Sequence, residues 1–229
     1  MIITFASSKG GVGKSTSCAC LAGALAQKGH TVHIIDLDGN HTVSRWFTQS
    51  GRAPDRITVS TPNPAALSDH LQAVATAEHP DYILIDIAGS YESALTIAMA
   101  RSHLTIIPAA PTEADLFEAS RVAHHLRSVF AAFDRAPLYR LLLTQVQPLA
   151  SHTQVHAFRE VERLGLPRFD AMLTHRASYQ EIGFSGLPPH LAAQSRPTVQ
   201  KAVTEINQWL SEVSALLTST SSTKTNVAA

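Results

Sequence analysis

An α/β fold is the class that the sequence predicts, because apolar runs typical of buried strands alternate with apolar stripes at helical spacing. The first run, residues 1–6, leads into a glycine-rich loop, residues 8–16, and a helical stripe follows from Cys18. Strand, glycine-rich loop and helix in this order are typical of phosphate-binding α/β proteins. The alternation continues without a linker, so we expect one domain over residues 1–217 and a polar, disordered tail over residues 218–229.

Composition excludes several classes of protein. Hydrophobic residues make up 45% of the chain and charged residues 16%, which excludes a wholly disordered chain. Eighteen basic residues balance eighteen acidic ones, so no overall field indicates nucleic acid or membrane as a partner. The two cysteines, Cys18 and Cys20, are expected to be small core residues. The N-terminus lacks a secretory signal and no apolar run approaches the length of a membrane span, so we expect a cytoplasmic protein.

The loop itself, Ser-Lys-Gly-Gly-Val-Gly-Lys-Ser-Thr, has the pattern of a phosphate-binding loop. Its three glycines let successive backbone N–H groups turn toward one point, where the following helix adds the positive end of its dipole. Lys14 is expected to reach the β- and γ-phosphates of ATP, and the Ser15 hydroxyl to join the Mg²⁺ shell. The nucleotide-binding residues expected from this loop are Lys9, Gly10, Gly11, Val12, Gly13, Lys14, Ser15 and Thr16.

Two positions distinguish the loop from the general pattern. Ser8 stands where the first glycine is expected, and a second lysine, Lys9, lies five residues before Lys14. This form resembles the deviant Walker A motif of the ParA/MinD family of dimeric ATPases. The resemblance implies that Lys9 crosses a dimer interface and contacts the phosphates held by the other subunit.

Two further strand-like runs end in carboxylates. Residues 31–36 end at Asp36, with Asp38 two positions on, and residues 82–86 end at Asp86. An apolar run closed by an aspartate, downstream of a phosphate loop, is the Walker B pattern, whose aspartate holds Mg²⁺ through water. In the resembled family an Asp-x-Asp belongs to the first switch, which implies that Asp38 orients the attacking water and that Asp36 supports the Mg²⁺ shell. The expected metal site is Ser15, Asp36 and Asp86.

Both carboxylate segments depart from the family's common pattern. Gly39-Asn40 stands where the family commonly has Pro-Gln, and Ile87-Ala88-Gly89-Ser90 replaces a Thr or Ser followed by two prolines. The second departure looks like that of small plasmid-partition ATPases such as ParF. The resemblance covers residues 1–217. It implies a P-loop NTPase fold: a mostly parallel twisted sheet, helices on both faces, and the Walker B strand beside the first strand.

The later part of the chain contributes further expected elements. Thr112 and Asp115 form a capping box pattern at the start of a helix whose buried stripe reaches Phe133. Residues 141–145 form a strand that in the family ends near the adenine, so Thr144 is an expected base contact. A last strand is expected over residues 169–173, before an apolar helix stripe that ends at Leu217.

The family resemblance implies a cycle of dimerisation and hydrolysis. ATP closes a sandwich homodimer, the dimer binds DNA non-specifically, and a small centromere-binding adaptor protein triggers hydrolysis, so that plasmid or chromosomal DNA is segregated. Lys9, Lys14 and Asp38 are the implied catalytic residues, and the ATP-bound protein is implied to associate with the nucleoid. Family DNA contacts fall in the C-terminal part, where the candidates are Arg140, Arg168 and Arg176.

Other functions share this nucleotide chemistry. A MinD-like membrane regulator needs a C-terminal amphipathic helix with a basic face, but here Lys201 is accompanied by Glu205 and Glu212, so no membrane partner is expected. A redox protein of the nitrogenase-iron-protein type needs cluster-binding cysteines at the interface, and Cys18 and Cys20 lie on the loop's own helix. A conjugation accessory ATPase, or an ATPase that positions protein assemblies, remains an open alternative.

Overall fold

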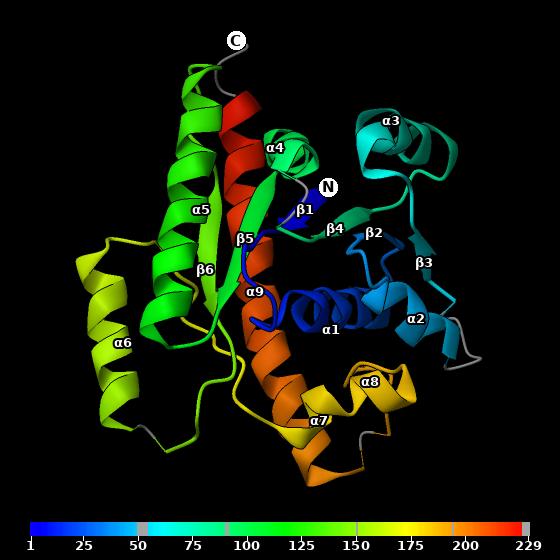
Figure 1. The fold of residues 1–229 in the computed structure, drawn as a ribbon. Helices are drawn as coiled ribbons and strands as arrows, with labels where there is room; N and C mark the ends of the chain where they lie inside the picture. Colours follow the sequence, from blue (N-terminus) through cyan, green and yellow to red (C-terminus); the bar gives the residue numbers. More distant parts are fainter. Residues whose placement is uncertain (50–54, 90–91, 150, 194, 226–229) are drawn as a thin grey trace.

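A six-stranded sheet forms the centre of the computed structural model, which describes residues 1–49, 55–89, 92–149, 151–193 and 195–225 (Figure 1). Its strands follow the order β3-β2-β4-β1-β5-β6, and all neighbouring pairs are parallel. The strands are β1 (Ile2–Phe5), β2 (Val32–Leu37), β3 (Ile57–Ser60), β4 (Tyr82–Ile87), β5 (Leu104–Ala109) and β6 (Tyr139–Leu143). The predicted α/β class is confirmed, as is the position of the Walker B strand, β4, beside β1.

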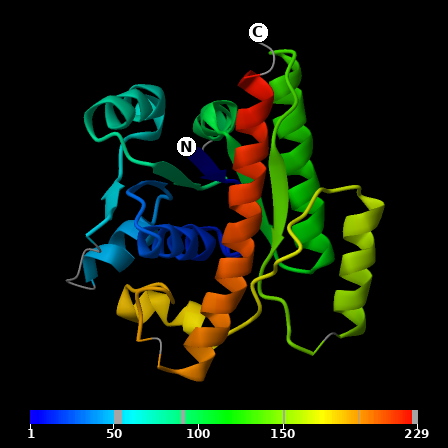
Figure 2. The ribbon, with the colours of Figure 1, turned by 180° about the vertical axis from the view of Figure 1, so that it is seen from behind.

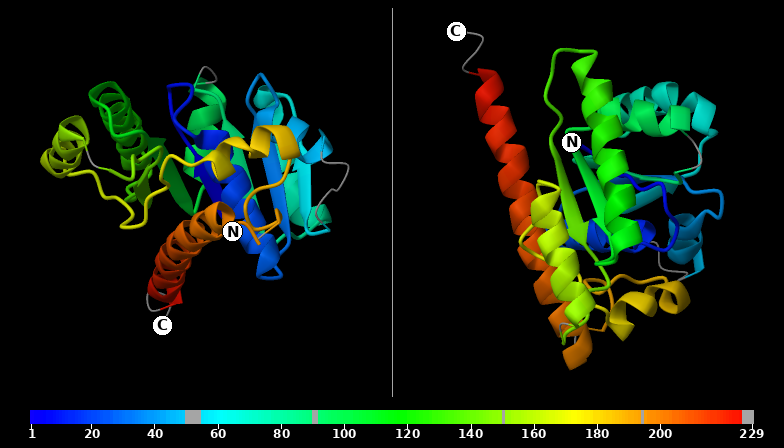
Figure 3. Two further views of the ribbon diagram at one scale, coloured as in Figure 1. Left: turned by 90° about the horizontal axis from the view of Figure 1, so that it is seen from below. Right: turned by 60° about the vertical axis from the view of Figure 1, so that its left-hand side comes forward.

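Helices cover both faces of the sheet, as Figures 2 and 3 show for α9 and α5, which lie on opposite sides of the strands. One apolar core lies under α1 (Lys14–Gln27), α2 (Thr42–Gln49), α7 (Ala177–Gln180), α8 (Ile182–Ser185) and α9 (Pro197–Thr225). The other lies under α3 (Leu67–Ala77), α4 (Glu92–Arg101), α5 (Glu113–Ala131) and α6 (His152–Arg163). A 3₁₀ turn, η1 (Pro64–Ala66), precedes α3.

Burial on both faces explains why the central strands are continuous apolar runs. Along β1, Ile3 and Phe5 point into the core under α1 and α9, and both are fully buried. Trp209 on α9 closes this core, since its ring meets the rings of Phe5 and Phe169 edge to face at centroid distances of 6.3 and 6.1 Å. Cys18 on α1 is fully buried in the same core, as its predicted core role requires.

The predicted strand over residues 169–173 is wrong. The segment lies beside β6 but touches this region through isolated bridges, at Leu141 with Arg168 and at Val146 with Thr174. The backbone N–H groups of Asp170 and Ala171 donate instead to the carboxylate of Glu212 on α9, at 2.8 and 2.7 Å. The N–H groups of Phe169 and Leu173 donate to the carbonyl oxygens of Leu141 and Leu143, each at 2.9 Å, but Glu212 takes the Ala171 N–H between them and so interrupts the ladder.

Two helix ends also differ from the prediction. Phe133 is not part of a buried stripe, because α5 ends at Ala131 and leaves the Phe133 side chain 64% exposed. The last helix, α9, runs beyond Leu217 to Thr225, since no glycine or proline interrupts it there. Residues 226–229 of the expected tail lie outside the described residues.

The strand register brings the carboxylates together at one edge of the sheet. Asp86 on β4 is the register partner of Asp36 on β2 and of Phe5 on β1. The glycine-rich loop leaves β1 at the same edge, immediately after Phe5. This is the carboxyl edge, where open parallel sheets bind ligands.

Candidate nucleotide-binding site

The glycine-rich loop adopts a backbone that needs glycine at two positions. Gly11 has a φ of 80° and Gly13 a φ of 86°, both in the left-handed region that side chains disfavour. Gly13 is the N-cap residue of α1, and no side chain caps this helix. The first N–H groups of α1 therefore remain available at the loop, where the helix dipole favours an anion.

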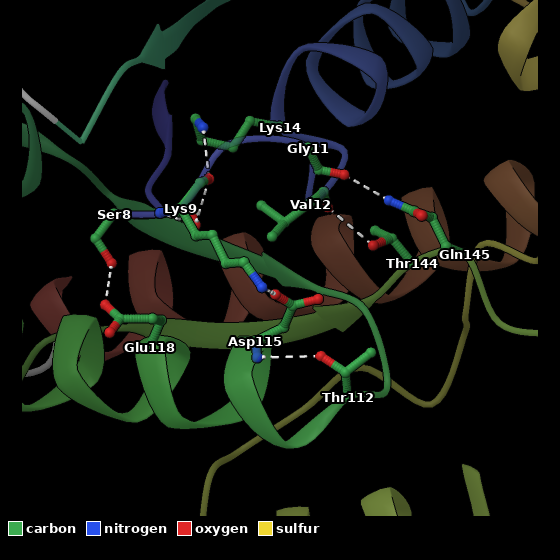
Figure 4. Close-up of polar contacts among 11 residues, drawn as sticks. Ser8, Lys9, Gly11, Val12, Lys14, Thr112, Asp115, Glu118, Thr144 and Gln145 are labelled. Carbon is green, nitrogen blue, oxygen red and sulfur yellow. Dashed lines mark hydrogen bonds and ion pairs between the residues drawn. The ribbon is translucent and has the colours of Figure 1, made fainter. Parts of the chain in front are cut away.

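The residues that follow β6 hold the loop in this shape (Figure 4). The Thr144 hydroxyl donates to the carbonyl oxygen of Val12 at 2.9 Å, and the Gln145 amide donates to that of Gly11 at 2.6 Å. Gln145 itself has a φ of 54°, an uncommon conformation for a residue with a side chain. These contacts occupy loop carbonyls, whose negative ends would otherwise repel a phosphate. The predicted contact of Thr144 with the base stays a prediction.

The two loop lysines have different surroundings. The Lys14 residue is 7% exposed, and its ammonium donates to the carbonyl oxygen of Lys9 at 3.3 Å. The Lys9 ammonium contacts the carboxylate of Asp115, on the first turn of α5. Thr112 caps α5 as predicted, since its hydroxyl accepts from the Asp115 N–H at 3.2 Å. The carboxylate of Asp115 thus pairs with Lys9, while its backbone N–H takes part in the helix cap.

Asp86 is fully buried, and neither of its carboxylate oxygens accepts a hydrogen bond from the described residues. The pKa of Asp86 is raised to about 7, mainly by burial and also by the neighbouring Asp36 carboxylate, while the nearby Ser15 hydroxyl and Lys14 ammonium act to lower it. Three residues on, Gly89 lies so close to the loop that a Cβ would overlap the backbone of Ser8. The residue after it, Ser90, lies outside the described residues.

The carboxylates of the first switch segment are partly used to shape it. Asp36 is buried, and its two oxygens accept from the N–H groups of Asp38 and Ser44 at 3.1 and 2.9 Å. Burial nevertheless raises the pKa of Asp36, against the lowering effect of these two hydrogen bonds. Asp38 accepts from the Asn40 N–H at 2.8 Å and lines the pocket beside the loop. The predicted role of Asp38 in orienting water stays a prediction.

A pocket of about 480 Å³ adjoins the loop and the N-terminus of α1. Its far wall contains Trp46 on α2 and Tyr179 and Gln180 on α7. Trp46 packs against the core and also lines the pocket. Of the pocket residues outside the glycine-rich loop and the Asp38 segment, only Thr144 and Arg176 were predicted as site residues. Gln145 and the other lining residues between Leu173 and Gln180 were not.

The residues present fit a Mg²⁺ nucleotide. A buried carboxylate without a donor, as at Asp86, is stabilised by a cation or by its water shell. Among the described residues, no three or more His, Cys, Asp or Glu side chains are arranged to hold an ion by themselves. Mg²⁺ does not require such a group, because it commonly binds one or two carboxylates together with substrate phosphates and waters. Ser15, which lines the pocket, and Asp86 are the residues that would hold it.

The three arginines predicted to contact DNA lie in different environments. Arg176 donates to Glu205 from Nε at 2.9 Å and from Nη2 at 2.5 Å, and it lines the nucleotide pocket. Arg140 and Arg168 donate to backbone carbonyls next to them in sequence, at 2.8 and 2.9 Å. Of the three, Arg176 has its charge most fully compensated. The described helices include none with the length and apolar content needed to cross a membrane.

Comparison with known proteins places these features in a family. The sequence model described as VirC1 protein matches residues 1–224. The chain belongs to the VirC1 protein family. It is also 34% identical over 121 residues to Protein virC1 of Rhizobium radiobacter, a match that covers 52% of each chain.

The chain is also similar to proteins named for partition. This VirC1-family chain is 27% identical over 188 residues to Protein ParA of Rhizobium radiobacter, covering 79% of the chain and 81% of the relative. Its fold matches a putative plasmid partition protein of Borrelia burgdorferi B31 bound to AMPPNP, with a TM-score of 0.68, 18% identity, and coverage of 92% and 97%. The predicted relationship to ParA/MinD ATPases and the P-loop NTPase fold are both confirmed.

Proposed function

We propose that this protein is a Mg²⁺-dependent ATPase of the ParA type that dimerises with ATP, binds DNA non-specifically and segregates a DNA cargo. One observation carries the proposal: the uncapped N-terminus of α1, Lys14 and the unpaired Asp86 carboxylate meet at one edge of the sheet. Positive groups for phosphates and a negative group for a cation are the complementary halves of a Mg²⁺-nucleotide site.

In this proposal each residue has a limited task in the transfer of the γ-phosphoryl group to water. Lys14 and the loop N–H groups balance the charge of the β- and γ-phosphates, and Mg²⁺ supplies further charge neutralisation when it is bound at Ser15 and Asp86. Asp38 orients the water that attacks the γ-phosphorus as the bond to the bridging oxygen breaks. Lys9 contributes from the second subunit. ADP and inorganic phosphate are the products.

Binding to DNA is the feature that connects the nucleotide cycle to a cargo. The chain has no net charge, so the monomer lacks a strong attractive field. A dimer presents each basic side chain twice, and non-specific DNA affinity requires only a local row of phosphate contacts. Arg140 and Arg168 are the better candidates, because Arg176 is paired with the largely buried Glu205, whereas Arg168 has only the exposed carboxylate of Asp170, at 3.6 Å. The relatives named as ParA and as a putative plasmid partition protein support DNA as the cargo. In this proposal the partner that stimulates hydrolysis is a small centromere-binding adaptor.

Fluorescence anisotropy with unrelated labelled duplexes tests this function. We expect binding with ATP and Mg²⁺, little binding with ADP, and a steep loss with added salt. The Asp38→Ala variant is expected to bind ATP and DNA but to hydrolyse ATP at least about tenfold more slowly, since it loses water positioning. Asp69→Ala on exposed α3 is the matched control and should behave as the wild type.

Two outcomes would contradict the DNA assignment. Equal DNA binding with ATP, with ADP and without nucleotide would show that DNA binding is not coupled to the ATPase cycle. An Asp38→Ala protein that binds ATP and dimerises but does not bind DNA would favour an ATPase that positions protein assemblies. If Asp38→Ala hydrolyses ATP at the wild-type rate, another residue orients the water.

A further inference from the structure

The start of the phosphate loop is held by two acidic residues of α5, which the nucleotide chemistry does not explain. Asp115 and Glu118 lie one helical turn apart and face Ser8 and Lys9 (Figure 4). Asp115 contacts the Lys9 ammonium, and the Glu118 carboxylate accepts from the Ser8 hydroxyl at 2.6 Å. We call these four residues the α5 clamp.

The α5 clamp directs Lys9 onto its own subunit. The Lys9 side chain extends along the loop to Asp115, whereas the Lys14 side chain lies on the other side of the loop (Figure 4). The Asp115 side chain is 9% exposed and that of Lys9 is 44% exposed, so the contact is shielded from water on the acidic side. A lysine held in this way is not extended toward a second subunit.

The surroundings of Asp115 offset part of its charge when Lys9 leaves, although its side chain is buried. Asp115 is the third residue of α5 after the Thr112 cap, in the first turn, where the helix dipole stabilises a carboxylate. Its backbone N–H is already satisfied by the Thr112 hydroxyl. The contact joins this buried carboxylate to a half-exposed ammonium, so Lys9 can return to water while the helix dipole continues to stabilise Asp115.

Glu118 explains the serine at a position where the general loop pattern has glycine. A glycine at position 8 would offer no hydroxyl to the Glu118 carboxylate. The hydrogen bond from Ser8, together with contacts from Arg121, lowers the pKa of Glu118, so this carboxylate is charged at neutral pH. The acidic face of α5 thus holds both residues that begin the loop.

We propose that Asp115 is a positioning residue that acts through Lys9: it keeps the lysine in its own subunit and must release it before Lys9 can serve a second copy of the chain. Glu118 supports this by fixing Ser8. The inference rests on the proposed function, because it assumes an ATP-dependent dimer. According to this inference, the α5 clamp raises the protein concentration at which this dimer forms.

The test compares Asp115→Asn with the wild type. Specific ATPase activity is measured against protein concentration with ATP and Mg²⁺, and the concentration at half-maximal activity reports dimerisation. Without the charge that retains Lys9, we expect this concentration to fall about fivefold, as for a pair of modest strength. ADP affinity measured by calorimetry should not change, because Asp115 does not line the nucleotide pocket.

Three variants serve as controls. Asp115→Glu restores the charge and should return the midpoint toward the wild-type value. Glu113→Gln removes one charge from the same turn of α5 at an exposed position and should leave the midpoint unchanged. Glu118→Gln, which leaves Asp115 in place, should lower the midpoint by less than Asp115→Asn and replaces it if that variant does not fold.

The outcomes separate the inference from the proposed function. A wild-type protein that never dimerises with ATP contradicts the proposed function itself. If the wild type dimerises but Asp115→Asn has the same midpoint or a higher one, the α5 clamp does not restrain Lys9 and this inference fails. If Asp115→Asn and Glu113→Gln shift the midpoint equally, the effect comes from the loss of any negative charge on this turn of α5, and the inference is likewise overturned.

Discussion

Two acidic side chains, Asp86 and Glu205, are both withdrawn from water but have opposite surroundings. Asp86 has no hydrogen-bond donor among the described residues, and burial raises its pKa to about 7. Burial also acts to raise the pKa of Glu205, but hydrogen bonds from Arg176, Thr174 and Tyr179 outweigh it and hold that pKa below its usual value. One carboxylate lacks a partner, and the other has several.

This difference distinguishes a carboxylate of a binding site from a carboxylate that holds two segments of the fold together. We call the second, Glu205 with its hydrogen-bond partners, a structural tie. Glu205 on α9 joins the segment of Thr174 to the last helix, since it accepts from the Thr174 hydroxyl and the Tyr179 hydroxyl, each at 2.8 Å. The contacts of Glu205 therefore stabilise the folded chain. Among the described residues, Ser15 and Lys14 offset only part of the cost of burying Asp86, which is expected where a ligand completes the site.

The largest expected effect is that of Lys14→Ala, which changes the candidate nucleotide site near Asp86 and leaves the Glu205 contacts in place. We expect ATP affinity to fall about 100-fold or more, roughly 2.8 kcal/mol, because the other loop ammonium, Lys9, is held by Asp115 within the monomer. The fold loses one hydrogen bond to the Lys9 carbonyl, so the unfolding midpoint should change little. Titration calorimetry measures the first quantity and urea unfolding the second. Affinity within a few-fold of the wild type would contradict the phosphate-loop assignment.

Glu205→Ala should have the reverse pattern. It leaves Arg176 without its carboxylate and removes the acceptor of Thr174 and Tyr179, so the free energy of unfolding should fall by about 2–4 kcal/mol. Urea unfolding measures this value. Glu160→Ala, which breaks an exposed i,i+3 pair with Arg163, is the control and should be close to the wild type. Equal effects of the two variants would show that the Glu205 contacts are not a structural tie.

The same tie predicts a dependence on pH. A carboxylate whose pKa is depressed in the folded state stabilises the protein above its unfolded pKa, near 4.3, and loses this contribution as the pH falls through the folded pKa. The difference in unfolding free energy between the wild type and Glu205→Gln should be constant above about pH 5.5 and shrink below about pH 4.3. A difference that stays constant on acidification would contradict the assigned shift.

Much of the fold could be predicted because its signals are local. The glycine-rich loop and the apolar run before Asp86 are read from consecutive residues, and both lie where the prediction placed them. The four-residue helices α7 and α8 are too short to show a period. Helix α4 was missed because small residues, among them Ala94 and Ala98, make up much of its buried face.

The site was predicted less completely, because its missing contacts join distant segments. Lys9 and Asp115 are 106 positions apart, and Gln145 is 134 positions from the carbonyl of Gly11 that it holds. No local pattern signals such pairs. Trp46 shows the same limit: an aromatic residue on an amphipathic helix indicates packing, and only the folded chain reveals that the pocket adjoins it.

The central claim is that the unpaired Asp86 carboxylate belongs to a Mg²⁺-nucleotide site, and ATP titrations with and without Mg²⁺ test it most directly. For the wild type we expect Mg²⁺ to raise ATP affinity by at least about tenfold, or 1.4 kcal/mol. Asp86→Asn should lose this gain, yet its nucleotide-free form should melt no lower than the wild type, since it removes a buried charge without a donor. An Asp86→Asn protein that keeps the full gain from Mg²⁺, or that unfolds as readily as Glu205→Ala, would contradict the claim.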